Sequence, residues 1–445
     1  MPEHADVIVV GARCAGSPLA ALLARAGVRV VVLERAEFPS DTLSSHLFEA
    51  DAISFLNRLG VLERLRATGA PLVARTDTRV EDLQLAMELP QQPDDVGAIV
   101  SVRRTLLDPI LAEAAAQAGA DVRTGARVTG LLEEDGRVAG VRFEQAGAES
   151  ELRARLVVGA DGRHSTLARL VGARMYNLTP SQRLLFWAYF EGADPGAEPT
   201  FLSHRWGERF ILAIPSDSGL YQVLLWPEQS ERERFQSDRD GVFLDHARAC
   251  EPVADALVGA RRVGKTMGAF RWEGFFRQAA GAGWVLCGDA GHFKSPAPGR
   301  GIGDAFLQAE RLATAITAAL EGSDEALDLA MRAWGRWRDR EFAEQYWLAY
   351  DLEEAGAAPS VLVEILRGLQ RTGNAGLFFE VLNHRARPSQ VLTPARALGA
   401  GARLLAKRGS HRRALLAELG TLGARDMRRR RLNARPVYAP GPQPG

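Results

Sequence analysis

The first 34 residues constrain the fold of this chain more than any other stretch. A short apolar run from Asp6 to Val10 ends at Gly11, and a helical pattern follows that closes at Gly27. A second apolar run ends on Glu34, about 20 residues past the glycine turn. Apolar runs of this length are typical of parallel strands that are buried on both faces. The pattern therefore predicts a βαβ unit at the start of the chain.

The turn of this unit has the spacing of a dinucleotide-binding fingerprint. Gly11 and Gly16 stand at two of its glycine positions, and Glu34 stands where an acidic residue binds ribose hydroxyls. Arg13 occupies the middle position, where a glycine normally lets the backbone approach the pyrophosphate closely. An arginine there either narrows this approach or adds a charge-assisted contact to the phosphates. An ordinary turn without a ligand is the alternative, but position, helix and Glu34 together favour a dinucleotide.

Composition excludes several other classes of protein. The 55 Lys and Arg residues balance 55 Asp and Glu residues, so net charge gives no attraction to nucleic acid. The start of the chain does not have the pattern of a signal peptide, and no apolar run reaches the ~18 residues of a transmembrane helix. The widely spaced cysteines predict neither a disulfide framework nor a metal site, and they indicate a reducing, cytoplasmic compartment; they are Cys14, Cys250 and Cys287.

The rest of the chain changes its pattern three times. Strands and helices alternate over residues 1–174 and resume over 276–324, while residues 175–275 predict an inserted, mostly antiparallel sheet and residues 325–425 a helical region. The fold class expected is thus α/β (α+β overall). The candidate strands of the insert are Leu184–Phe190, Thr200–Arg205, Arg209–Ile214, Leu220–Trp226 and Gly264–Trp272.

The end of the chain, residues 426–445, predicts a solvated, disordered tail. It opens with the run Arg428–Arg431 and closes with proline and glycine. Contact of these arginines with an acidic partner is the alternative.

Two further motifs follow later in the chain. Gly159–Gly162 is a strand followed by a turn, which alone says little. Gly288–His292 is followed by Pro296 and by the glycine-rich stretch Gly299–Gly303, which opens a helix. An aspartate at a strand end, here Asp289, can accept hydrogen bonds from a sugar-alcohol chain. A glycine-rich helix start offers free N–H groups to an electron-rich ring.

Together the three motifs resemble the FAD-dependent, para-hydroxybenzoate-hydroxylase-like superfamily over residues 5–320. That superfamily includes aromatic monooxygenases, geranylgeranyl reductases and flavin-dependent halogenases. The resemblance implies a Rossmann-type FAD-binding domain that carries the inserted sheet as a substrate domain. The residues that it implies as FAD contacts are Gly11, Arg13, Cys14, Ala15, Gly16, Glu34, Arg35, Arg104, Val128, Asp161, Gly288, Asp289, Pro296, Gly299, Arg300, Gly301 and Ile302.

The chain departs from the family pattern at several positions. Arg13 replaces a glycine, Arg300 stands between two glycines, and Gly303 stands where many hydroxylases have asparagine. Halogenases carry a Trp-x-Trp-x-Ile-Pro stretch, but Phe210 and Leu212 occupy the two tryptophan positions here. We therefore do not expect halide to be a substrate.

His46 has two interpretations that the sequence leaves open. From the loop after the second strand it could reach the flavin edge as a catalytic acid or base, because imidazole titrates near neutrality. It could equally cap or pack at a helix start.

The strands of the insert are apolar on both faces, so one face can pack on the core while the other covers the flavin. The alternative is that both faces are simply buried. The candidate substrate contacts are Trp187, Phe210, Leu212 and Gln222.

The activity expected from the resemblance is monooxygenation of an apolar or aromatic small molecule, a secondary metabolite being one candidate, with NAD(P)H and O2. NAD(P)H is expected as a co-substrate without a domain of its own, because no second fingerprint occurs. The alternatives are a reductase of prenyl double bonds and a non-catalytic FAD-binding protein. The sequence gives no indication of oligomeric state.

Overall fold

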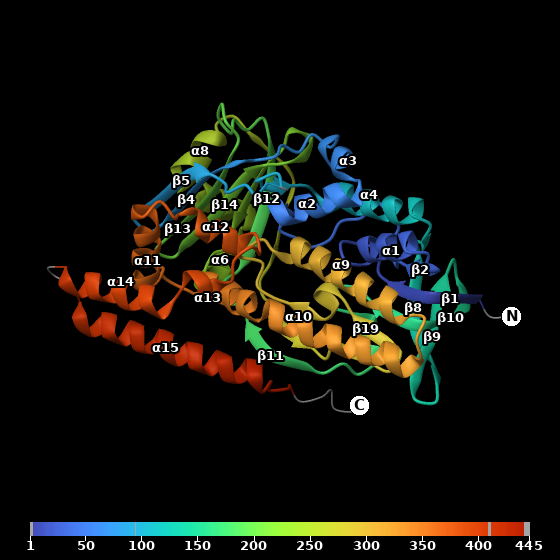
Figure 1. The fold of residues 1–445 in the computed structure, drawn as a ribbon. Coiled ribbons are helices and arrows are strands. Elements are labelled where there is room, and N and C mark those ends of the chain that lie inside the picture. The colour runs from blue at the N-terminus through green and yellow to red at the C-terminus, as the bar shows by residue number, and fades with distance from the viewer. Residues whose placement is uncertain (1–2, 94, 408–410, 440–445) are drawn as a thin grey trace.

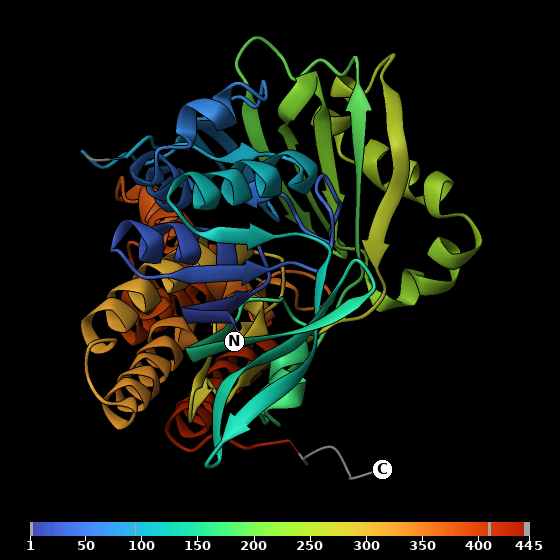
Figure 2. The same cartoon turned by 90° about the vertical axis from the view of Figure 1, so that its right-hand side faces the viewer.

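A computed structural model describes residues 3–93, 95–407 and 411–439 of the protein. Two large sheets stand side by side, and helices of the C-terminal third lie along both (Figure 1). Figure 2 shows the green strands of one sheet beside the blue and cyan strands of the other. The expected α/β class with an added, mostly antiparallel sheet is confirmed.

The first sheet is built around β1 (Glu3–Val10), which pairs in parallel with β2 and β10. Val7 and Val9 pack against helices on one face, while Ile8 packs against a β-hairpin on the other. This double cover explains why β1 is apolar throughout. The other strands of the sheet are β2 (Val30–Leu33), β7 (Asp121–Arg123), β8 (Ala126–Glu134), β9 (Arg137–Gln145), β10 (Ala148–Gly159), β18 (Ala280–Gly281) and β19 (Trp284–Leu286).

Several helices contribute to the core on the Val7 and Val9 face of this sheet, and three of them pack together around the first. They are α1 (Gly16–Arg25), α4 (Arg104–Gln117) and α9 (Gly301–Ala319). The remaining helices before residue 300 are α2 (Ala50–Leu59), α3 (Leu62–Arg66), α5 (Thr166–Leu170), α6 (Arg232–Ser237), α7 (Arg239–Arg248) and α8 (Glu251–Ala256), with short 3-10 turns η1 (Asp217–Gly219), η2 (Gln229–Glu231) and η3 (Gly288–Ala290).

The second sheet has seven strands in the order β16-β12-β15-β14-β13-β4-β5. It is larger than the predicted insert, because β4 and β5 come from residues assigned to the first unit and β4 pairs in parallel with β13. A pairing across more than a hundred residues leaves no local sequence pattern. The strands are β4 (Arg75–Val80), β5 (Leu83–Glu88), β12 (Leu185–Glu191), β13 (Thr200–Trp206), β14 (Arg209–Pro215), β15 (Tyr221–Leu225) and β16 (Arg261–Ala269).

Two small sheets connect these units. The strands at the two ends of the predicted insert are not part of the seven-stranded sheet. They are β11 and β17, which pair with each other, and β17 also pairs with β20, the strand that follows η3. The strands are β11 (Met175–Pro180), β17 (Glu273–Arg277) and β20 (His292–Phe293), with β3 (Leu47–Phe48) and β6 (Val100–Ser101) in the second pair.

Helices fill the C-terminal third of the chain. None of the helices in the described residues is both long and apolar enough to cross a membrane. They are α10 (Asp324–Leu352), α11 (Ser360–Arg371), α12 (Gly376–Leu382), α13 (Pro388–Val391), α14 (Pro394–Ala406) and α15 (Arg412–Ala434).

The prediction of a disordered tail from residue 426 is wrong for its first part. Helix α15 continues to Ala434 because its inward face is paired: Arg425 and Arg429 both form ion pairs with Asp351 at the end of α10. Arg425 and Arg429 are four residues apart, so both lie on the same side of the helix and reach Asp351. They therefore hold the helix against α10 and are not part of a solvated run. Residues 440–445 of the predicted tail lie outside the described residues.

Two buried arginines close the C-terminal end of α10. The guanidinium of Arg183, which is completely buried, donates to the carbonyl oxygens of Glu208, Trp226, Glu354 and Gly356. Arg205 donates to the carbonyls of Leu352 and Glu354. The last carbonyls of a helix have no partner within it and carry partial negative charge, so these cations satisfy and stabilise the end of α10.

We predict that Arg183→Leu lowers the free energy of unfolding by about 3 kcal/mol, because it leaves several buried carbonyls without a donor. Urea denaturation followed by circular dichroism measures this change. Arg271→Leu is the control, since Arg271 is exposed and has no side-chain partner among the described residues. Equal losses in the two variants would contradict the assignment.

Glu353 lies next to this helix end and is only 1% exposed. Ser295 donates from its Oγ to Glu353 Oε2 at 2.8 Å. Burial raises the pKa of Glu353 to about 8, although the hydrogen bond from Ser295 opposes this shift. The carboxyl group is therefore neutral in the folded protein at pH 7.

A raised folded-state pKa gives stability that is complete below the unfolded-state pKa and is lost as pH rises through the folded-state value. We predict that the wild type loses stability relative to Glu353→Gln between about pH 5 and pH 8, because only the wild type must ionise this buried group. Thermal unfolding of both proteins across this range tests the prediction. A difference in Tm that does not change with pH would show that Glu353 does not titrate there.

Candidate functional site: a cavity at the carboxyl ends of the parallel strands

A cavity of about 380 Å³ lies at the carboxyl ends of β1, β2 and β10. Ligands of open α/β sheets bind at this edge, where the strand order reverses. Thirteen of the predicted contacts line it: Gly11, Arg13, Cys14, Ala15, Glu34, Arg35, Arg104, Val128, Asp161, Asp289, Pro296, Gly301 and Ile302. The predicted contacts that do not line it are Gly16, Gly288, Gly299 and Arg300.

Gly16 and Gly288 are required for packing around the cavity. A Cβ atom on Gly16 would lie 1.8 Å from the carbonyl oxygen of Gly11, and one on Gly288 would lie 2.8 Å from the Cβ of Ala15. Gly288 also has a φ of +62°, which disfavours other residues. Both glycines thus hold helix and strand ends close together.

Glu34 stands at the end of β2 and is 4% exposed. Its carboxylate accepts hydrogen bonds from the backbone N–H of Ala12 at 2.9 Å and of Ala36 at 3.0 Å. Each oxygen accepts one of these bonds, which leaves further lone pairs on a side chain that lines the cavity. This geometry is compatible with the predicted contact to ribose hydroxyls.

Asp108, which is completely buried, positions two arginines of the cavity wall. Its oxygens accept hydrogen bonds from Arg13 Nη1 at 2.6 Å and from Arg104 Nε at 2.7 Å. Burial disfavours the charged form of Arg104, but Asp108 more than offsets this and raises its pKa. Arg13 also donates to Ser40 at 2.8 Å. Arg13, in the middle glycine position of the fingerprint, is thus held as a cation at the wall of the cavity.

Two aspartates on the wall keep acceptor capacity that the described residues do not use. Asp161 accepts from the backbone N–H of Thr166 through Oδ2, while its buried Oδ1 has no partner there. The Asp289 carboxylate likewise has no hydrogen-bond donor in the described residues, and burial raises its pKa to about 6 despite the nearby Arg104. Unused buried acceptors at a cavity indicate a ligand with hydroxyl or N–H groups.

The N-terminus of the 19-residue helix α9 forms another part of the wall, through Gly301 and Ile302. Its free N–H groups and positive end favour negative charge nearby. Lys294 and Asp304 lie beside it as a buried ion pair that also lines the cavity. Lys294 is unusual, because it is one of three lysines in the chain and only 6% exposed.

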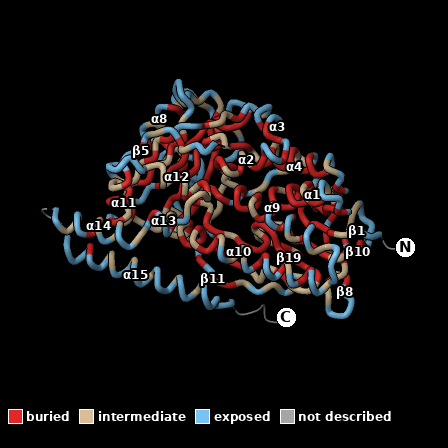
Figure 3. Tube along the Cα trace, in the orientation of Figure 1, coloured by how far each residue is buried: buried red, intermediate tan, exposed pale blue. Residues whose placement is uncertain are grey.

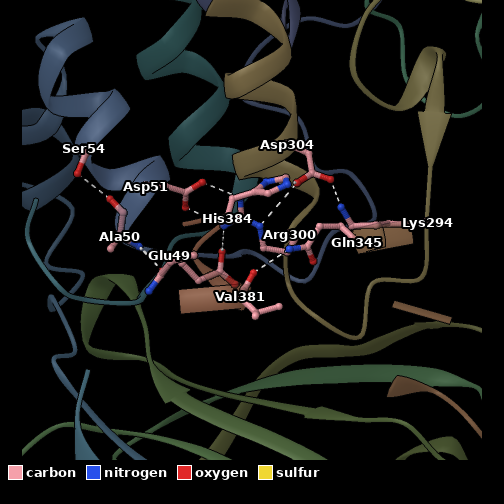
Figure 4. Close-up of polar contacts among 11 residues, drawn as sticks. Glu49, Ala50, Asp51, Ser54, Lys294, Arg300, Asp304, Gln345, Val381 and His384 are labelled. Atoms are coloured by element: carbon pink, nitrogen blue, oxygen red, sulfur yellow. Dashed lines mark hydrogen bonds and ion pairs between the residues drawn. The ribbon is translucent and has the colours of Figure 1, made fainter. Parts of the chain in front are cut away.

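Arg300 does not contact the cavity, which corrects the prediction for this residue. Its completely buried guanidinium donates to Asp51 at 2.6 and 2.7 Å and to Glu49 at 3.1 Å, both at the start of α2. Its Nη2 lies 3.2 Å from Nδ1 of His384, which follows α12 (Figure 4). Arg300 thus joins three distant segments behind the glycine-rich loop.

His46 does not line the cavity either, although its neighbours Ser44 and Ser45 do, and its contacts favour the packing interpretation. The side chain is 2% exposed, and its Nδ1 shares a short hydrogen bond with the hydroxyl of Tyr189. It meets the ring of Trp187 edge-on at 6.1 Å. Burial, assisted by the Arg104 cation, lowers the pKa of His46 to about 3. A neutral imidazole enclosed in this way is poorly placed for acid catalysis.

Two predicted substrate contacts are buried inside the second sheet. Trp187 is 1% exposed and lines neither this cavity nor the smaller one described below. Gln222 accepts a hydrogen bond from Ser101 at 2.7 Å and donates to the carbonyl of Ser45 at 3.0 Å. Its amide is therefore already used to hold the loop before His46.

The other two predicted substrate contacts, Phe210 and Leu212, line a separate apolar cavity of about 70 Å³. This second cavity lies between the seven-stranded sheet and the C-terminal helices, with Gly299 of the glycine-rich loop in its wall. Its helical wall includes Leu362, Leu366, Phe378, Phe379 and Leu382. The glycine-rich loop therefore separates the two cavities.

Sequence reasoning missed several residues of the main cavity. Leu185 of the second sheet and Trp272, between β16 and β17, bring apolar surface, and Arg163 and Lys294 bring charge. Lys294 is the residue that the sequence alone could have indicated, because a lysine is unusual beside a loop rich in glycine and proline.

The fit to FAD is good on chemical grounds. Arginines line the cavity near the fingerprint turn, as a pyrophosphate requires, and Asp161 and Asp289 offer acceptors to hydroxyl groups. A helix start with free N–H groups stands where a ring with negative charge would be stabilised.

Comparisons with known proteins agree with this assignment. Residues 4–332 match the family described as FAD binding domain. The rifampicin monooxygenase of Streptomyces venezuelae is 27% identical over 320 residues, which are 71% of this chain and 65% of that protein. The digeranylgeranylglycerophospholipid reductase of Methanosarcina acetivorans is 27% identical over 350 residues, covering 76% and 82% of the two chains.

The solved structure of a flavin-dependent brominase variant has the same fold. It superposes with a TM-score of 0.72 at 19% identity, covering 90% of this chain and 98% of that one. The match of the family profile spans well over half of the sequence, and the resemblance inferred from the three motifs is confirmed. The chain belongs to the FAD binding domain family of flavoprotein oxidoreductases, and the proteins similar to it include a monooxygenase, a prenyl-lipid reductase and a brominase.

Proposed function

We propose that the protein is an NAD(P)H-dependent FAD monooxygenase that oxidises an apolar or aromatic small molecule. The observation that carries this proposal is the apolar cover over the flavin-type cavity. Leu185 and Ala269 of the second sheet and Trp272, which follows its strand β16, line the cavity together with the first residues of α9. An oxygen-transferring site must keep water away from the reacting centre, and apolar side chains do this.

The bound FAD would supply the transfer of electrons from NAD(P)H to oxygen. The chain's own residues bind and orient the cofactor. Asp289 would accept hydrogen bonds from its hydroxyl groups, Arg13 and Arg104 would compensate its phosphate charge, and the N-terminus of α9 would favour negative charge on its ring. NAD(P)H would act as a co-substrate without a domain of its own, because the sequence contains only one dinucleotide fingerprint.

The substrate class follows from the second cavity. Phe210 and Leu212 provide an apolar wall that reaches the loop at Gly299. Charged residues are scarce in this lining, so it favours an apolar group over a charged one. At about 70 Å³ this cavity has room for only a small apolar group of a substrate.

A reductase of prenyl double bonds is the second candidate. The match to the digeranylgeranylglycerophospholipid reductase covers more of both chains than the match to the rifampicin monooxygenase does. The same apolar second cavity would accept a prenyl chain. Halogenation is disfavoured, because Phe210 and Leu212 replace both tryptophans of the halogenase stretch.

We predict that the purified protein is yellow and that Asp289→Ala raises the Kd for FAD roughly ten- to hundredfold, the value of one or two lost hydrogen bonds to a charged acceptor. Titration of the apoprotein with FAD, followed by flavin fluorescence, measures this. His46→Ala is the control, because His46 does not line the cavity, and it should retain FAD better. Equal weakening in both variants would contradict the role of Asp289.

We predict that turnover requires O2 and transfers one of its atoms to the product. The enzyme is incubated with NADH or NADPH, with bromide and with either rifampicin or a geranylgeranylated lipid under labelled dioxygen, beside a control without oxygen. A product that carries one labelled oxygen atom supports monooxygenation. A product two hydrogens heavier that forms equally fast without oxygen would establish the reductase instead, and a brominated product would establish a halogenase.

A further inference from the structure

Helix α15 has an outward face, and none of its residues lines either of the two cavities described above. Its inward face is occupied: Leu415, Leu419 and Leu422 pack in one cluster with α11 and α14, while Arg425 and Arg429 pair with acidic residues at the end of α10. The rest of the helix is exposed and is drawn almost entirely in pale blue in Figure 3. This outward face therefore has no partner in the described part of the chain.

The charge of this outward face is strongly positive, although the whole chain is neutral. Helix α15 contains seven arginines and two acidic residues. Both acidic residues are occupied, Glu418 by Ser360 and Asp426 by Arg430. Four exposed arginines have no side-chain partner among the described residues: Arg412, Arg413, Arg428 and Arg431.

Apolar side chains lie between these arginines. Leu416 is 58% exposed and Met427 is 59% exposed. The spacing of Arg413, Leu416, Met427 and Arg431 places all four on the same side of an α-helix. The outward face thus consists of an apolar middle with cations at both ends.

The stability of the helix does not explain this arrangement. Arg412 and Arg413 occupy the first turn, which contains no acidic residue. Cations are unfavourable there, because the N-terminus of a helix carries partial positive charge. The two arginines therefore weaken the isolated helix, which indicates a role toward something outside the chain.

We propose that the outward face of α15 binds the surface of a bilayer that contains anionic phospholipids. The arginines meet the phosphate and acidic head groups, and Leu416 and Met427 enter the boundary between head groups and acyl chains. A second copy of the chain is a poorer partner, because it would bring a face of like charge. Nucleic acid would leave the apolar middle without a partner.

The test is co-sedimentation of the FAD-loaded protein with two kinds of vesicle. Neutral vesicles contain phosphatidylcholine alone, and anionic vesicles contain in addition roughly 30% phosphatidylglycerol. We expect partitioning onto the anionic vesicles to exceed that onto neutral vesicles by roughly tenfold or more, and to fall as salt is raised. The variant with Arg412→Gln, Arg413→Gln, Arg428→Gln and Arg431→Gln should lose this preference. Leu416→Ser with Met427→Ser should weaken binding at every salt concentration.

Two matched variants separate the proposal from loss of fold or of net charge. Replacing the same four arginines by lysine should preserve binding, since charge is kept. Replacing four exposed arginines elsewhere by glutamine should also preserve it; these are Arg169, Arg248, Arg332 and Arg336. The proposal is overturned if neutral and anionic vesicles bind equally, or if this second set loses binding as much as the α15 set. It is also overturned if the α15 arginines instead control binding to duplex DNA or self-association in solution.

Discussion

The ends of β1 and β10 lie in close contact at the edge of the sheet where the main cavity lies. Gly11, at the end of β1, has a φ of +102°, and a Cβ atom on it would lie 2.6 Å from the carbonyl oxygen of Ala160 at the end of β10. Only glycine permits this contact. It brings the fingerprint turn against the second motif, so that Glu34, Asp161 and Asp289 face one cavity although they are far apart in sequence.

Charge inside the protein is arranged in pairs around this edge. Asp108 holds two arginines toward the cavity, whereas Arg300 is held behind the glycine-rich loop by Glu49 and Asp51. A buried cation without such partners would be costly, and a paired one fixes the position of the backbone that carries it. The glycine-rich loop is therefore supported by segments that do not line the main cavity, including His384 of the C-terminal third.

The C-terminal helices do more than extend the chain. The buried Arg183 and Arg205 bind the end of α10, and Ser295, shortly before the glycine-rich stretch, donates to Glu353 in the same place. Helices α11 and α12 form one wall of the apolar second cavity. The size of a substrate would consequently depend on a region in which the sequence shows only helical periodicity.

The sequence by itself determined the fold class and the cofactor, because both depend on local features: buried runs, glycines with fixed spacing, and an acidic residue at a strand end. The tertiary structure decided the contacts of individual side chains. Whether Arg300 meets the flavin or Asp51, whether His46 is free or bound to Tyr189, and whether β4 joins the second sheet are set by segments far away in sequence. Arg425 and Arg429 are a further case in which the sequence alone was not enough. They belong to a packed helix and not to a solvated tail because both pair with Asp351 on α10, which is far away in sequence.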